Sequence, residues 1–234
     1  MHQVKALIFD VFGTLVDWRS SIARETRKAL SPLGIDTDWL AFADAWRNEY
    51  QPAMQEVRSG QVPFCKLDRL HRRNLDIVLE RAGLERVDET VRRELNLAWH
   101  RLDAWPDAAP GLHRLRAQFR LAPCSNGNIS LMVDLARRNH FPWDAILGAE
   151  LARDYKPKAV VYLAAAGAFD LDPDETMMVA AHSSDLAAAA AAGLRTAFIA
   201  RPDEYGPDTG ETVAGTAVDV SCASLIELAA VLEA

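Results

Sequence analysis

Four short stretches of the chain carry side chains that could act together in covalent chemistry. Asp10 ends an apolar run, where a rigid element would present its carboxylate as a nucleophile. Ser125 and Asn126 end a second apolar run, and a hydroxyl beside an amide can bind an anionic group or orient a nucleophile. Lys156 adds a cation and Asp185 a second acid. Taken singly, these residues also fit ordinary structural roles, as turn and helix caps, a solvated lysine and a first-turn acid.

The elements that would hold these side chains are four short apolar segments separated by helix-like sequence. They are expected to be strands over Val4–Phe9, Phe119–Cys124, Met177–Ala181 and Thr196–Ala200. Their alternation with helices is the βαβ rhythm of a doubly wound α/β fold with a parallel sheet. Polar residues follow the carboxyl ends of three of these segments, and open parallel sheets bind ligands at that edge. The sequence therefore predicts a single site there.

The strand signal disappears between residues 16 and 104, where helical periodicity replaces it. The residues that recur at helical spacings on one face are Trp39, Phe42, Ala43, Trp46 and Tyr50. Prolines after residue 105 mark the return to alternating strands and helices. We predict an α/β core domain over residues 1–15 and 105–234, with a helical cap domain, residues 16–104, inserted after the first strand.

The composition favours a globular protein that acts on small molecules. Half of the 234 residues are hydrophobic and the net charge is -7, so a basic surface for nucleic acid is not expected. No apolar run reaches the roughly 18 residues that a membrane span needs, and the N-terminus lacks a secretory signal pattern. Cys65, Cys124 and Cys222 match no metal or redox spacing. We expect a cytoplasmic protein with reduced thiols and with neither nucleic acid nor membrane as a partner.

The order of the four stretches resembles the four motifs of the haloacid dehalogenase superfamily. The resemblance spans the α/β part of the chain, and residues 16–104 stand where that superfamily carries its cap. It implies a Rossmann-like core. By this resemblance Asp10 is the nucleophile of the first motif and Ser125 the hydroxyl of the second. Lys156 is the cation of the third motif, and Asp185 is the acid of the fourth.

Two positions distinguish the branches of the superfamily. Phosphatases place a second Asp two residues after the nucleophile and commonly a magnesium-binding Asp in the fourth motif, whereas this chain has Phe12 and Ala181 there. The type II haloacid dehalogenases are more similar, because they have an aromatic residue at the position of Phe12 and use no metal or other cofactor. Arg47 after a tryptophan, Asn126 after the serine and Tyr162 after the lysine also match that branch.

The dehalogenase branch implies a two-step hydrolysis of a short 2-haloacid, which would be the small-molecule partner. Asp10 attacks the carbon that bears the halogen and forms an ester, and water then cleaves that ester to give the 2-hydroxy acid. Thr14 would support Asp10, Arg47 would accept the halide, and Asp185 would position Lys156 and the water. The residues implied to bind the substrate are Val11, Phe12, Asn126, Tyr162 and His182, with Ser125 beside Asn126 at the substrate carboxylate. The resemblance also implies a homodimer.

The fourth motif departs from the best-known dehalogenases, which carry Ser, Asn and an aromatic residue at the positions of Ala180, His182 and Ser184. His182 could replace the Asn as a hydrogen-bonding group or act as a base, and a structural histidine at the sheet edge is the alternative. These changes leave the preferred halogen open, with fluoroacetate as a hypothesis. The alternative functions are a phosphatase of a small phosphorylated metabolite and a catalytically silent binding protein.

Overall fold

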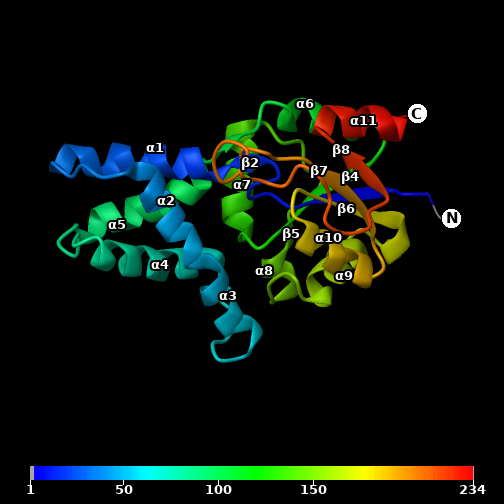
Figure 1. The fold of residues 1–234 in the computed structure, drawn as a ribbon. Coiled ribbons are helices and arrows are strands. Elements are labelled where there is room, and N and C mark those ends of the chain that lie inside the picture. The colour runs from blue at the N-terminus through cyan, green and yellow to red at the C-terminus, as the bar shows by residue number, and fades with distance from the viewer. Residues whose placement is uncertain (1–2, 234) are drawn as a thin grey trace.

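The computed structural model describes residues 3–233, which form a helix-covered sheet and a group of helices beside it (Figure 1). The sheet has the order β5-β4-β1-β6-β7-β8, and all its strands are parallel. The strands are β1 Ala6–Phe9, β4 Arg120–Ser125, β5 Leu147–Gly148, β6 Thr176–Ala180, β7 Arg195–Ile199 and β8 Val220–Cys222. The predicted doubly wound parallel sheet is therefore confirmed, with strand ends shifted by one or two residues.

Successive residues of the central strands point to opposite faces of the sheet, which gives the core two apolar layers. Leu7 and Phe9 of β1 join the layer that contains α6, α7 and α11, whereas Ile8 joins the layer that contains α9 and α10. The helices of this part are α6 Ala108–Leu115, α7 Ile129–Asn139, α8 Ala149–Ala152, α9 Ala159–Gly167, α10 Ser183–Ala191 and α11 Leu225–Glu233. Because helices cover both faces, polar side chains gather at the carboxyl edge of the sheet.

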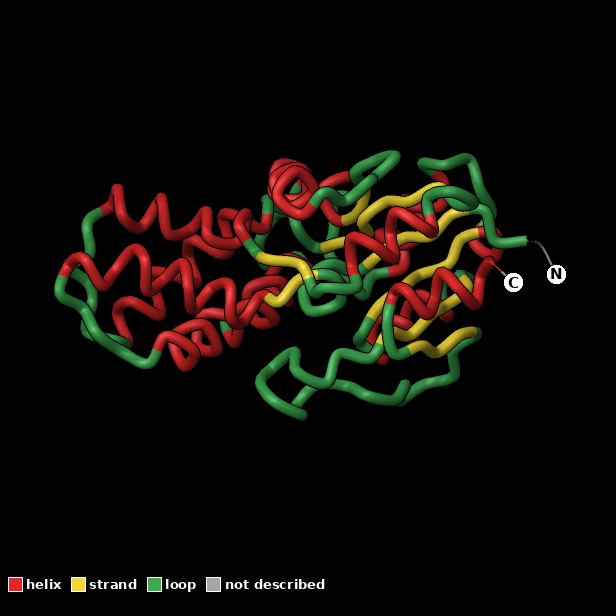
Figure 2. Tube along the Cα trace, turned by 90° about the horizontal axis from the view of Figure 1, so that it is seen from above, coloured by secondary structure: helices red, strands yellow, loops and turns green. Residues whose placement is uncertain are grey.

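The helices between β1 and α6 form a separate group in space (Figure 2). A short antiparallel ribbon of β2 Val16–Asp17 and β3 Asp103–Ala104 joins this group to the sheet. Its helices are α1 Trp18–Leu30, α2 Trp39–Asn48, α3 Tyr50–Arg58, α4 Leu67–Arg81 and α5 Glu89–Asn96. Side chains of Asp17, Asp38 and Asp88 accept backbone N–H bonds where α1, α2 and α5 begin. No helix among residues 3–233 is long and apolar enough to cross a membrane.

The stretch whose apolar residues predicted one helical face contains two helices. Phe42, Ala43 and Trp46 are buried on α2, as the periodicity predicted, and Trp39 is half-buried. The helix ends at Asn48, and Tyr50 begins α3. Arg47, in the last turn of α2, lies over the ring of Tyr50.

Candidate active site

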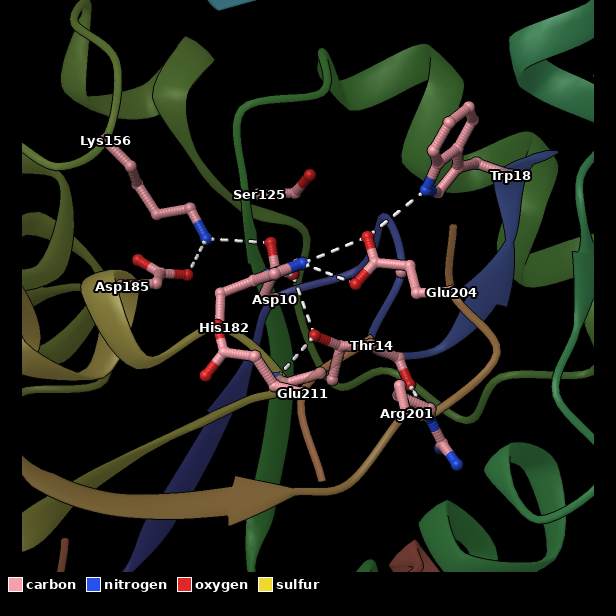
Figure 3. Close-up of polar contacts among 12 residues, drawn as sticks. Asp10, Thr14, Trp18, Ser125, Lys156, His182, Asp185, Arg201, Glu204 and Glu211 are labelled. Atoms are coloured by element: carbon pink, nitrogen blue, oxygen red, sulfur yellow. Dashed lines mark hydrogen bonds and ion pairs between the residues drawn. The ribbon is translucent and has the colours of Figure 1, made fainter. Parts of the chain in front are cut away.

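Three of the predicted residues meet at the carboxyl edge of the sheet (Figure 3). Asp10 follows β1, Lys156 precedes α9, and Asp185 lies in the first turn of α10. The Lys156 Nζ atom is 2.9 Å from Asp10 Oδ1 and 2.5 Å from Asp185 Oδ2. Each of the three residues is less than a tenth exposed. One buried ammonium group therefore binds and orients both carboxylates.

Thr14 fixes the second oxygen of the Asp10 carboxylate. Its hydroxyl donates to Asp10 Oδ2 at 2.8 Å and accepts the backbone N–H of Ala181 at 2.9 Å. The backbone carbonyl of Thr14 accepts a bond from Arg201 Nε at 2.8 Å. The turn after β1 is thus tied to the ends of β6 and β7, and the Asp10 side chain has little freedom to rotate.

The charges around Asp10 keep its carboxylate ionised. Burial alone would raise the pKa of Asp10, but the charges and hydrogen bonds of Lys156 and His182 outweigh burial and hold that pKa far below its usual range. Burial would likewise lower the pKa of Lys156, whereas Asp10 and Asp185 raise it well above its ordinary value. The pair is therefore charged throughout the neutral pH range.

His182 bridges Asp10 to a second buried acid, Glu204 (Figure 3). Its Nδ1 atom is 3.2 Å from Asp10 Oδ2, and its Nε2 atom is 2.9 Å from Glu204 Oε2. Glu204 is 1% exposed and also accepts a bond from Trp18 Nε1. Burial opposes protonation of His182, but its bonds to the two carboxylates raise its pKa to about 10. His182 therefore lies against the nucleophile as an imidazolium.

Sequence reasoning missed Glu204, which lies in an irregular loop after β7. The close approach of this side chain depends on Gly13, which has a φ of +84°, and a Cβ atom there would lie 2.1 Å from Glu204 Oε1. The position of the loop was the one available signal, because it follows the carboxyl end of a parallel strand. Ligand sites of open parallel sheets lie at these strand ends, and that rule had already indicated Asp10 and Asp185.

A cavity of about 540 Å³ opens over Asp10. Its lining consists of Asp10, Phe12, Arg47, Tyr50, Gln51, Gln55, Arg58, Asn126, Lys156, Pro157, Lys158, His182, Ser184 and Asp185. The Arg47 guanidinium stacks on the Tyr50 ring at 4.0 Å, and its buried Nη1 atom has no hydrogen-bond partner among the described residues. Arg47 thus has an N–H group available for an anion in this cavity.

The second motif lies at the base of the same cavity. Asn126 Oδ1 accepts the backbone N–H of Lys156 at 2.8 Å, which ties the second motif to the third. Ser125 is fully buried, and its Oγ atom accepts the backbone N–H of Gly127 at 3.0 Å. Asn126 is part of the cavity lining, whereas Ser125 lies behind it, and the Ser125 hydroxyl donates to no group among the described residues.

Val11 and Tyr162 have positions that differ from the prediction that they contact a substrate. The Val11 side chain packs in the apolar core, and its carbonyl accepts the backbone N–H of Leu15. Tyr162 is not part of the cavity lining, and its hydroxyl donates to Asp185 Oδ1 at 2.5 Å. Tyr162 thus orients Asp185 through the hydrogen bond that its hydroxyl donates. Val11 shapes the turn after Asp10 through its backbone carbonyl.

The side chains near Asp10 give no set of oxygen ligands of the kind a phosphatase uses for magnesium. Phe12 stands where a phosphatase has its second Asp, and Ala181 stands where a phosphatase has its magnesium-binding Asp. Among residues 3–233, no group of three or more His, Cys, Asp or Glu side chains is arranged to hold a metal ion. What the arrangement can do is covalent catalysis, with an ionised nucleophile, a histidine–glutamate pair and a free guanidinium around one cavity.

Comparison with known proteins agrees with this geometry. The profile of the haloacid dehalogenase-like hydrolases matches residues 4–193. (S)-2-haloacid dehalogenase 1 of Pseudomonas sp. (strain CBS-3) is 30% identical over 212 residues, which cover 88% of this chain and 89% of that protein. The crystal structure of a defluorinating L-2-haloacid dehalogenase is 44% identical, with a TM-score of 0.96 and coverage of 99% and 96%. A second L-2-haloacid dehalogenase structure is 45% identical, with a TM-score of 0.94 and coverage of 98% and 99%. The chain therefore belongs to the haloacid dehalogenase-like hydrolases, in their L-2-haloacid dehalogenase branch.

Proposed function

We propose that this protein hydrolyses the carbon–halogen bond of short 2-haloacids, with Asp10 as the nucleophile. The observation that carries the proposal is the environment of Asp10. Its carboxylate is buried and kept ionised by Lys156 and His182, while Phe12 takes the place of a phosphatase's acid. A buried anion without a metal ligand set beside it is suited to attack on carbon.

In the first step an Asp10 oxygen forms a bond to the substrate carbon as the carbon–halogen bond breaks. The halide leaves with the bonding electron pair, opposite the attacking oxygen, so the configuration at the carbon inverts. Arg47 donates an N–H group to the departing halide, since its Nη1 atom is buried and has no partner among the described residues. Asn126 holds the substrate carboxylate at the base of the cavity, and Ser125 supports this end of the site from behind the lining.

The second step uses the pair of His182 and Glu204. Once Asp10 is an ester it carries no charge, so the pKa of His182 falls and its Nδ1 proton is lost to solvent. The free Nδ1 atom then takes a proton from a water molecule that attacks the Asp10 carbonyl carbon. The bond between that carbon and the ester oxygen that links it to the substrate then breaks, and this oxygen takes the proton from Nδ1 to become the product hydroxyl. The second proton of the water passes from the new Asp10 carboxyl group to Nδ1, which regenerates the Asp10 carboxylate and the His182 imidazolium. Glu204 stabilises the imidazolium meanwhile, and Asp185 positions Lys156.

The two alternative functions lack a supporting observation in the site. A phosphatase would need an acid near the leaving group and a magnesium ligand, and Phe12 and Ala181 supply neither. A catalytically silent binding protein has no need for a buried carboxylate held ionised by two cations. Fluoride is included among the proposed leaving groups, because a 44% identical relative is named a defluorinating L-2-haloacid dehalogenase.

The helices of residues 16–104 are proposed to act as a cap domain over the α/β core of residues 1–15 and 105–234. Arg47 and Tyr50 support this division, because they reach from these helices into the cavity over Asp10.

We propose a homodimer in the cytoplasm as well, on the basis of the family resemblance and the free cysteines. Light scattering coupled to gel filtration tests the dimer.

The test of the proposed reaction compares the wild type with Asp10→Asn for halide release from 2-chloropropionate, chloroacetate and fluoroacetate. The wild type is expected to release halide in the presence of EDTA, and Asp10→Asn to be slower by about a thousandfold or more. Asp208→Asn, at an exposed position, is the matched control. Equal rates for Asp10→Asn and wild type would refute the mechanism. Magnesium-dependent phosphate release without halide release would establish the phosphatase instead.

A further inference from the structure

The cavity is larger than a small haloacid needs. Its volume of about 540 Å³ lies in the range that suits ligands of drug size, whereas 2-chloropropionate has only a handful of heavy atoms. The inner part contains Asp10 and Arg47. The outer part is lined by polar side chains of α3, namely Gln51, Gln55 and Arg58.

Arg58 is the unusual member of this outer part, because its guanidinium contacts only neutral groups. Its Nη1 atom donates to the Lys156 carbonyl at 2.9 Å, its Nε atom to Gln55 at 3.0 Å, and its Nη2 atom to Gln51 at 3.2 Å. In contrast, Arg19 and Arg73 of the same helical group form two-bond pairs with carboxylates. Among the residues that the structure describes, no carboxylate is within ion-pair distance of Arg58, and Asp154 acts on it only through its charge.

The position of Arg58 relative to Asp10 is set by Lys156. The backbone carbonyl of Lys156 accepts the Arg58 bond, while the tip of the Lys156 side chain binds Asp10. Arg58 therefore lies about one lysine side chain away from the nucleophile. Burial lowers the pKa of Arg58, and the charges of Tyr50 and Asp154 offset this in part. Asp154 forms its own ion pair with Lys158.

Arg47 thus lies in the inner part of the cavity and Arg58 in its outer part, and neither guanidinium is paired with a carboxylate of the described residues. A guanidinium has five N–H donors, and Arg58 uses three in the bonds above. The remaining donors, with the glutamine amides, match the two oxygens of a carboxylate. A ligand that spans the cavity from Asp10 would bring its far end to Arg58.

We propose that Arg58, with Gln51 and Gln55, binds a second carboxylate of the substrate, so that the preferred substrates are 2-halodicarboxylic acids such as 2-chloroglutarate. The inference rests on the proposed dehalogenase function and leaves its chemistry unchanged. The carbon–halogen bond breaks at Asp10 as before, and the second carboxylate takes no part in the reaction. Arg58 is a specificity-determining residue, because it acts on the end of the substrate that does not react.

The experiment measures kcat/KM for 2-chloroglutarate and for 2-chlorobutyrate, which lacks the second carboxylate. The wild type is expected to prefer the diacid by about tenfold or more, which is the effect of one charge-assisted bond pair. Arg58→Gln is expected to lower the ratio of the two kcat/KM values by about tenfold, mainly through the KM for the diacid. Arg58→Lys keeps the charge and is expected to restore part of the ratio. The control, Arg137→Gln, removes an exposed arginine of α7 outside the cavity.

The results separate this inference from the proposed function. A ratio that is the same in the wild type and Arg58→Gln overturns the inference, as does a wild type that releases halide from 2-chlorobutyrate but not from the diacid. Halide release from neither compound, nor from 2-chloropropionate, counts against the dehalogenase function itself. Added salt should also reduce the preference for the diacid in the wild type more than in Arg58→Gln, because Arg58 lies near solvent.

Discussion

At the scale of single residues, the chemistry depends on how His182 is shared between two carboxylates. While Asp10 is free, His182 is held as an imidazolium with a pKa of about 10. Alkylation of Asp10 removes one of its two anionic partners, so the same residue becomes a base only after the first step. Glu204 remains as the partner that holds the ring in place through Nε2.

Replacement of His182 by Gln is expected to slow the second step far more than the first. The reason is that Asp10 can still attack the substrate carbon, whereas water lacks a base near the ester. We expect kcat to fall by about a hundredfold to ten-thousandfold and the alkylated protein to accumulate. Intact-protein mass spectrometry during turnover of 2-chloropropionate measures the adduct.

The control for this change is His113→Gln, which replaces an exposed histidine on α6. It is expected to turn over normally and to show no adduct. A slow His182→Gln enzyme without any adduct would contradict the assignment, because the first step would then be the one that His182 supports.

At the scale of elements, the tight turn after β1 determines the site. Gly13 in this turn has a positive φ, and its Cα faces the Glu204 carboxylate so closely that a side chain would collide with it. The turn also donates the Thr14 hydroxyl to Asp10. One short turn thus positions both the nucleophile and the partner of His182.

Gly13→Ala is expected to lower the free energy of unfolding by about 1–3 kcal/mol, because the methyl group meets Glu204 and the backbone conformation favours glycine. Gly167→Ala is the matched control. It lies at the exposed end of α9, where an added Cβ meets nothing within 4 Å, and should raise stability slightly. Urea unfolding of both variants measures the free energy of unfolding. Equal changes in Gly13→Ala and Gly167→Ala would contradict the claim that the turn at Gly13 requires glycine.

The elements were the part of this protein that the sequence predicted well. Short apolar segments between helical stretches specified the parallel sheet, and the polar residues that follow them specified Asp10, Ser125 and Asp185, because both follow from local periodicity. Lys156 precedes a helix, and only the family resemblance indicated its role. Glu204 lies in an irregular loop without such periodicity, so its contact with His182 depends on tertiary structure. Arg58 also gave no signal, since a charged residue on a helix normally faces solvent.

At the scale of the whole molecule, the buried charges link the stability of the fold to pH. The folded-state pKa of His182 is about 10, above its ordinary value of 6.5. Its stabilising contribution is therefore fully present below pH 6.5 and is lost as the pH rises to about 10. We expect the free energy of unfolding to fall by about 2–4 kcal/mol over that interval.

Urea unfolding of the wild type and His182→Gln at pH 6 and pH 10 checks this expectation. The wild type should lose more stability than the variant, which has no imidazolium to deprotonate. The same pH dependence in both proteins would show that other groups cause the change.

The central claim is that Asp10 becomes an ester whose carbonyl carbon is then attacked by water. The most direct test is turnover of 2-chloropropionate in H₂¹⁸O with the enzyme in excess, followed by mass spectrometry of the lactate and of the peptide that contains Asp10. The account predicts that ¹⁸O enters the Asp10 carboxylate and that the lactate formed in a single turnover carries no label. Label in the lactate and none in Asp10 would contradict it, because water would then have attacked the substrate carbon directly.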